Sequence, residues 1–144
     1  MKKTYKEYKS ECSDELNTFA EQNCIWAFGK EQLTEALKKL NLTEAEFQEK
    51  YTGFFGGGAI LKDKVQAYLD LCKKQNDELQ ELLKDPEFCY EALYYELANH
   101  EFGYTGDETP ALIVLGLTAE DICSNKVLNE AYCRAVSDIK NSDY

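Results

Sequence analysis

The chain has 144 residues, with 27 acidic and 16 basic side chains, and its formal net charge is −11. Hydrophobic residues make up 44% of the chain, and glycine and proline occupy only 8 and 2 positions, which excludes low-complexity disorder and fibrous repeats. The acidity argues against direct nucleic-acid binding, because phosphate contacts need clustered lysine and arginine and the chain contains a single arginine, Arg134.

A chain of this length is most simply one domain. The sequence contains no internal repeat and no linker, so we expect 1–144 to form a single compact domain. We expect a mainly α fold of about six helices, with α+β as the alternative class. The alternative rests on two short apolar runs, 24–28 and 58–61, which we expect to pair as a small two-stranded β ribbon.

The first part of the chain contains three predicted helices. Apolar residues step by three and four along 5–19 and again along 33–40, which indicates two amphipathic helices. Between them, 24–28 is a short apolar run typical of a buried strand. Thr43 and Glu46 have the spacing of a reciprocal capping box, which predicts that a short helix begins there, with Phe47 and Tyr51 on its inward face.

A glycine-rich break follows at 53–58, where adjacent glycines carry a large entropy cost in any helix. A Walker-type phosphate loop needs Lys and then Ser or Thr directly after the last glycine, but Ala59 and Ile60 follow Gly58. The dinucleotide-binding glycine pattern also fails. We therefore interpret the run as a tight turn, or as backbone that another element approaches closely, and we do not expect nucleotide binding.

The rest of the chain is predicted to be helical. Asp63 is a candidate N-cap for a long helix, and Asp85 caps the next one, which extends to about residue 101. Thr109 begins a short apolar helix, and Thr118 begins the last helix. The helix after Asp85 is apolar on nearly all sides, so we expect it to be central in the fold or covered by a partner.

Most of the negative charge lies in one segment, 85–125, which contains nine acidic residues, six aromatic residues and no lysine or arginine. One interpretation is a solvated acidic face beside a core helix. The other is a surface that selects a basic partner by charge. On the second interpretation, the residues expected to contact the partner are Glu87, Glu91, Tyr94, Glu101, Asp107 and Glu108.

The same segment contains the only histidine, His100. A zinc-protease motif is excluded because Tyr104 stands where the second histidine would be. Glu96 precedes His100 by four residues in the predicted helix, so the two side chains are placed to touch. We interpret this region either as a partly buried histidine satisfied by Glu96 or as a polar recognition site. The candidate polar site comprises Glu96, Asn99, His100, Tyr104 and Asp107.

No catalytic residue, metal site or cofactor is expected. The six cysteines form no Cys-x-x-Cys pair, and most fall on apolar helical positions, so we expect free thiols that fill the core. No apolar run approaches the ~18 residues of a membrane span. Lysines and tyrosines follow Met1 where a signal peptide would need an apolar run, so we expect a cytoplasmic protein.

Three stretches of the sequence occur in an order that suggests a family. They are 26–33 (Trp-Ala-Phe-Gly-Lys-Glu-Gln-Leu), 56–62 (Gly-Gly-Gly-Ala-Ile-Leu-Lys) and 99–107 (Asn-His-Glu-Phe-Gly-Tyr-Thr-Gly-Asp). Together they resemble an uncharacterised family of small proteins from bacterial phages, plasmids and integrative elements. The resemblance extends over about residues 25–118, and the Asn-His-Glu-aromatic-x-Tyr-Thr motif is its most specific part. It implies a mobile-element accessory protein of a bacterial host cell, without a known activity.

Our leading hypothesis is a non-enzymatic interaction protein that binds a basic protein surface. Carboxylates of 85–125 would occupy a groove meant for nucleic acid, as in an inhibitor of a host defence effector such as a CRISPR nuclease. One alternative is a small-molecule-binding protein or enzyme with a site around His100. The other is a structural homodimer in which a second copy covers the helix at 86–101. Neither membrane binding nor direct nucleic-acid binding is expected.

Overall fold

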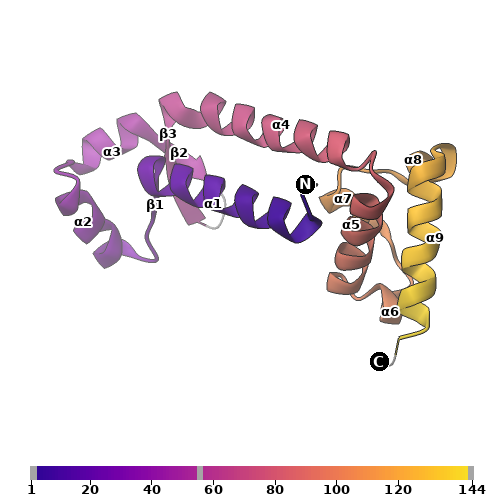
Figure 1. The fold of residues 1–144 in the computed structure, drawn as a ribbon. Helices are drawn as coiled ribbons and strands as arrows, with labels where there is room; N and C mark the ends of the chain where they lie inside the picture. Colours follow the sequence, from indigo (N-terminus) through magenta and orange to yellow (C-terminus); the bar gives the residue numbers. More distant parts are fainter. Residues whose placement is uncertain (1–2, 55–56, 143–144) are drawn as a thin grey trace. The chain divides into compact units, whose positions relative to one another are not determined.

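The computed structural model describes residues 3–54 and 57–142. Within them the chain forms nine α-helices and a small antiparallel sheet of three strands, so the expected mainly α fold is confirmed. The elements in chain order are α1 (Tyr5–Asn23), β1 (Cys24–Trp26), α2 (Lys30–Lys39), α3 (Glu44–Lys50), β2 (Tyr51–Phe54), β3 (Gly58–Leu61), a 3₁₀ helix (Lys62–Lys64), α4 (Val65–Leu82), α5 (Pro86–Asn99), α6 (Phe102–Thr105), α7 (Thr109–Val114), α8 (Ala119–Ser124) and α9 (Lys126–Lys140) (Figure 1).

The contacts within the chain define two compact units. The sheet unit is Ser10–Lys73, and it contains the three strands with α2 and α3. The helical unit joins Met1–Lys9 to Lys74–Tyr144, and it contains α5 to α9. The boundaries fall inside α1 and α4. The expectation of a single domain over 1–144 stays a prediction.

The strand order in the sheet is β1-β3-β2, and both pairings are antiparallel. The expected pairing of 24–28 with 58–61 is confirmed, with Cys24 opposite Ile60 and Trp26 opposite Gly58. Strand β2 was not expected, because Tyr51 follows Phe47 at helical spacing. The two rings do stack, with centroids 5.1 Å apart, although the backbone at Tyr51 has already become extended (φ −117°, ψ 155°). Phe55 and Gly56 of the expected turn lie outside the described residues.

One face of the sheet contains a cluster of aromatic rings, here called the aromatic core of the sheet unit, in which Trp26 remains 41% exposed. Trp26 and Phe54 flank Gly58 in the register, and their rings meet with centroids 5.9 Å apart. Phe54 in turn contacts Tyr68 of α4 at 4.9 Å. A Cβ atom on Gly58 would lie 2.6 Å from Nε1 of Trp26, so this position has to be glycine for the indole to cross the central strand. Ile60 is buried on the same strand.

Helix α5 is the central element of the helical unit, and its main neighbours are α9, α7 and α6. Asp85 caps α5 by accepting a hydrogen bond from the N–H of Phe88, as its sequence predicts. The helix ends at Asn99, before the expected residue 101, because Glu101 takes a left-handed conformation with φ 59°. The last predicted helix is also divided: Thr118 begins α8, and Asn125 caps a separate α9. Short helices therefore account for the larger number of helices.

The cysteines are free thiols and differ in burial. Cys89 is fully buried in α5, and burial raises the pKa of its thiol to about 12. Cys123 and Cys133 are exposed, so only some of the six cysteines fill the core as expected. Within the described ranges, no helix combines the length and the apolar character that a membrane span requires.

We expect Gly58→Ala to lower the free energy of unfolding of the sheet unit by about 1–2 kcal/mol, because the indole of Trp26 must rotate away from Phe54 to admit the methyl group. Urea unfolding monitored by the fluorescence of Trp26, the only tryptophan, measures the change. Gly53→Ala is the matched control, since a Cβ atom there meets no described atom within 4 Å. Equal effects of the two substitutions would contradict the steric explanation.

Candidate functional site

Among the described residues of the helical unit, the most buried charged side chain is Glu96, on the inner face of α5, with 1% of its side chain exposed. The hydroxyl of Tyr5 donates a hydrogen bond to Oε2 at 2.9 Å. The ammonium of Lys9 lies 3.0 Å from Oε2 and 3.3 Å from Oε1. A buried carboxylate is costly unless it is paired and hydrogen-bonded, and here the first turns of α1 supply both partners.

The buried contact also changes the chemistry of Tyr5. Burial, followed by the hydrogen bond to the Glu96 carboxylate, raises the pKa of Tyr5 well above its ordinary value. The phenol of Tyr5 therefore stays protonated and can donate its hydrogen bond to the carboxylate of Glu96.

Two basic side chains of the helical unit lie on tyrosine rings beside a carboxylate. The Lys9 ammonium is 4.9 Å from the ring centroid of Tyr95 while it pairs with Glu96. The Arg134 guanidinium carbon is 3.8 Å from the ring centroid of Tyr90, and its Nη1 donates to Glu87 at 3.0 Å. Each arrangement combines cation–π attraction with an ion pair.

A cavity of about 480 Å³, here called the tyrosine cavity, lies between the start of α1 and helix α5. Aromatic rings form much of its wall, and Lys6 and Glu91 are its charged lining residues. Tyr94 lies beside Tyr90, with ring centroids 5.9 Å apart. Among the described residues, Glu91 has no ion-pair partner within 4 Å, in contrast to Glu87. The tyrosines that line the cavity are Tyr5, Tyr90, Tyr94 and Tyr95.

The six residues expected to contact a partner fall into two groups. Glu87, Glu91 and Tyr94 lie on α5, and the latter two line the tyrosine cavity. The other three lie farther along the chain around α6 and α7. There Glu101 precedes α6, Glu108 precedes α7 and is half-buried, and Asp107 is exposed between the two helices.

The candidate polar site is distributed differently from the sequence expectation. Glu96 points into the core and bonds to α1, whereas Asn99 is exposed after it and His100 is half-buried at the end of α5. Tyr104 is 73% exposed on α6. Asp107 accepts a hydrogen bond from the N–H of Thr109, and that bond lowers the pKa of the Asp107 carboxyl. Within the described part of the chain, no group of three His, Cys, Asp or Glu residues is arranged to hold a metal ion.

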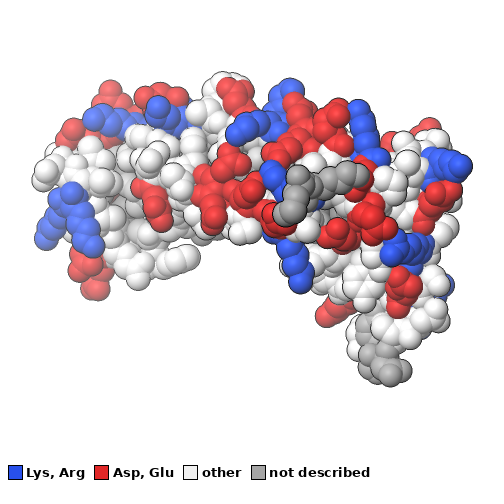
Figure 2. Space-filling model, viewed as in Figure 1, with Lys and Arg blue, Asp and Glu red and all other residues white. Residues whose placement is uncertain are grey.

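Several acidic side chains of segment 85–125 already have partners within the chain, so fewer of them are available to a binding partner than the composition indicates. Asp85, Asp107 and Asp121 accept hydrogen bonds from backbone N–H groups near helix starts. Glu87 pairs with the only arginine, and Glu96 is buried against Lys9. The fold thus brings basic groups to a segment that has none of its own. Figure 2 shows lysine and arginine interspersed with acidic residues on the face in view.

Sequence reasoning did not connect Tyr5, Lys9 and Arg134 with this site. Tyr5 and Glu96 are 91 positions apart, so no helical spacing relates them. The available signals were the apolar spacing that places Tyr5 on the buried face of its helix and the clustering of tyrosines near Glu91. Neither signal identifies the partner of a particular carboxylate.

Comparison with known proteins shows to which family the chain belongs. Residues 4–138 match a family of unknown function, DUF7659. The chain belongs to this family. No curated protein and no solved structure matches it. The expectation of an uncharacterised family is therefore confirmed, and the residues of the tyrosine cavity lie inside the part of this DUF7659 protein that matches.

We expect Lys9→Met to lower the free energy of unfolding of the DUF7659 chain by about 1–3 kcal/mol, because the Glu96 carboxylate would stay buried with Tyr5 as its remaining partner. Urea unfolding monitored by circular dichroism measures the loss. The double variant Lys9→Met with Glu96→Gln should recover part of it. Lys84→Met, at an exposed ion pair with Glu81, is the matched control and should be nearly neutral. A neutral Lys9→Met variant would contradict the assigned role.

The phenol of Tyr90 provides a pH test. Its hydroxyl donates to Asp138 at 2.7 Å, and this bond, followed by burial, raises the pKa of Tyr90 to about 12 from an ordinary value of 10.0. Because the folded pKa is the higher one, the stabilising effect is present below pH 10 and is lost as the pH rises through about 12. Asp138→Asn should lower the pKa, as measured by phenolate absorbance against a Tyr90→Phe reference. An unchanged titration would contradict the assignment.

Proposed function

We propose that the chain is a non-enzymatic protein that binds a basic protein partner, and that the tyrosine cavity takes a lysine or arginine side chain of that partner. One observation carries the proposal: the protein's own Lys9 and Arg134 each lie on a tyrosine ring beside a carboxylate. These contacts show that this combination of groups binds basic side chains in this structural setting.

Glu91 and Tyr94 supply a third ring and carboxylate. They are three residues apart on α5, which places them on adjacent positions of one helix face. Both line the tyrosine cavity, whose aromatic walls would remove water from an incoming side chain and strengthen its attraction to the carboxylate. Lys6 lines the same cavity and would repel a basic side chain, so the attraction depends on the carboxylate of Glu91.

The net charge of −11 supports the same kind of partner. An acidic protein attracts basic surfaces over a distance of about one Debye length, so charge would speed the encounter. The contact at the cavity would then provide specificity. Because several carboxylates of 85–125 are engaged within the chain, the proposal rests on the carboxylate of Glu91 rather than on the whole segment.

The more specific form of the proposal is an accessory protein of a mobile element that inhibits a nucleic-acid-binding defence effector of the host. It rests on the resemblance carried by 99–107 and on the acidity of the chain. Such a partner offers a groove rich in lysine and arginine, where an acidic protein would compete with nucleic acid. A purified CRISPR nuclease, assayed for DNA binding with and without this protein, tests the specific form separately.

The test of the general form uses a lysine- and arginine-rich peptide and isothermal titration calorimetry. We expect Glu91→Gln to weaken binding about tenfold, as the loss of one charge-assisted contact predicts. Glu120→Gln removes the same charge from an exposed residue of α8 in the same segment, and it should leave binding nearly unchanged. Equal weakening by both variants would show that only total charge matters, and absence of binding to the unsubstituted protein would overturn the proposal.

A further inference from the structure

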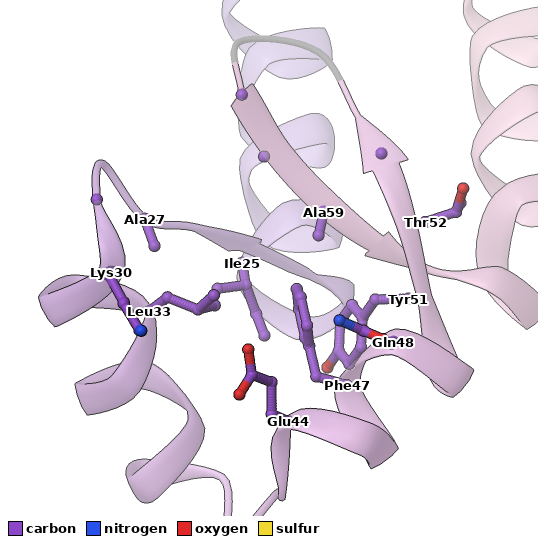
Figure 3. Close-up of a pocket in the computed structure, with 14 residues that line it drawn as sticks. Ile25, Ala27, Lys30, Leu33, Glu44, Phe47, Gln48, Tyr51, Thr52 and Ala59 are labelled. Carbon is purple, nitrogen blue, oxygen red and sulfur yellow. The ribbon is translucent and has the colours of Figure 1, made fainter.

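The sheet unit contains a cavity of about 570 Å³ on the face of the sheet opposite to its aromatic core. Figure 3 shows its lining residues, which come from the three strands and from helices α2 and α3. The volume is within the range of small-molecule sites in proteins. This cavity lies in a different unit from the tyrosine cavity, so a ligand bound here would be independent of the proposed function.

The floor of the cavity is one row of residues across the sheet. Ile25 on β1 is opposite Ala59 on β3, and Ala59 is opposite Gly53 on β2. Residues opposite each other in a sheet share a face, so all three positions face the cavity. The side chains become smaller along the row, and the floor over Ala59 and Gly53 is almost bare backbone.

Packing inside the chain does not explain the glycine at position 53. Its φ is outside the left-handed region, and a Cβ atom there would meet no atom of the described residues within 4 Å. Gly58 on the neighbouring strand differs, because the indole of Trp26 occupies the space of its side chain. Glycine weakens a strand, and in strands it is typical of a bulge, of a bend or of a site where another group approaches the backbone closely; the last of these fits a glycine on the floor of a cavity.

Two apolar side chains on the walls of the cavity favour a flat ligand. Leu33 of α2 and Phe47 of α3 point toward the floor from the two helices (Figure 3). The ring of Phe47 is held by Tyr51, with 26° between the two ring planes. The exposed backbone at Ala59 and Gly53 and the ring of Phe47 together form a narrow slot. An aromatic ring fills such a slot better than a branched aliphatic group does.

Two charged side chains of opposite sign are among the lining residues of the cavity. They are Lys30 of α2 and Glu44 of α3, and both are exposed (Figure 3). Neither has an ion-pair partner within 4 Å in the described parts of the chain. An ammonium and a carboxylate at separate positions of one apolar cavity would orient a ligand that carries an anionic group and a hydrogen-bond donor.

We propose that this cavity binds a small aromatic carboxylic acid that has a hydrogen-bond donor on its ring. The ring lies on the backbone of Ala59 and Gly53, its carboxylate pairs with Lys30, and its donor bonds to Glu44. Indole-3-carboxylate has this chemistry and is the probe for the test.

The experiment follows amide resonances of the full chain by NMR during titration with the probe. Saturable shifts are expected at Ile25, Gly53, Gly58 and Ala59. Gly53→Val fills the floor with a residue that strands favour, so it should abolish the shifts without lowering the melting temperature. Thr52→Val is the matched control, because Thr52 is on the same strand and its side chain points away from the cavity (Figure 3).

Two further ligands and two variants test the orientation. Indole lacks the carboxylate and 1-methylindole-3-carboxylate lacks the N–H donor, so each should bind about tenfold more weakly or worse. Lys30→Gln should remove the preference for the acid over indole, and Glu44→Gln should reduce the preference for the N–H compound. The proposal is overturned if the probe gives no saturable shift, if Gly53→Val binds it normally, or if the three compounds bind equally.

Discussion

The buried carboxylate of Glu96 is the constraint on which the helical unit depends. A carboxylate with 1% of its side chain exposed must be paired, and Tyr5 and Lys9 are its partners. Both lie in the first turns of α1, so this polar contact holds the start of the chain against α5. The same Lys9 ammonium lies over the Tyr95 ring. Tyr5 and Tyr95 both line the tyrosine cavity, so the buried contact lies beside this cavity.

A different constraint, one of space, organises the sheet unit. The indole of Trp26 crosses the central strand above Gly58 and meets Phe54, so one face of a very small sheet is filled by aromatic rings. The other face has Ala59 and Gly53 side by side, and the cavity lies between this face and helices α2 and α3. The two units therefore offer different chemistry: tyrosine rings with carboxylates in the helical unit, and an apolar slot with one charge of each sign in the sheet unit.

Much of the fold could be predicted because it depends on local rules. The caps at Thr43, Asp85 and Thr118 form as their spacing predicts, since each involves residues within one turn of helix. The pairing of β1 with β3 follows from two short apolar runs on either side of the predicted helices. Strand β2 was not predicted, because Phe47 and Tyr51 are four residues apart, as on one face of a helix. Their rings do contact each other, but the helix has ended and the backbone at Tyr51 is extended.

For function, the sequence by itself determined the kind of chemistry: an acidic chain, a tyrosine-rich helix after Asp85, and membership of DUF7659. It placed Glu91 and Tyr94 near each other, because one helix contains both. Only the tertiary structure decided which charges are satisfied. It paired Glu96 with Tyr5 and Lys9 rather than leaving it for His100. The partners of a buried charge come from segments that are distant in the sequence. A spacing rule relates residues within one helix or strand, so it cannot identify these partners, which depend on how several elements pack together.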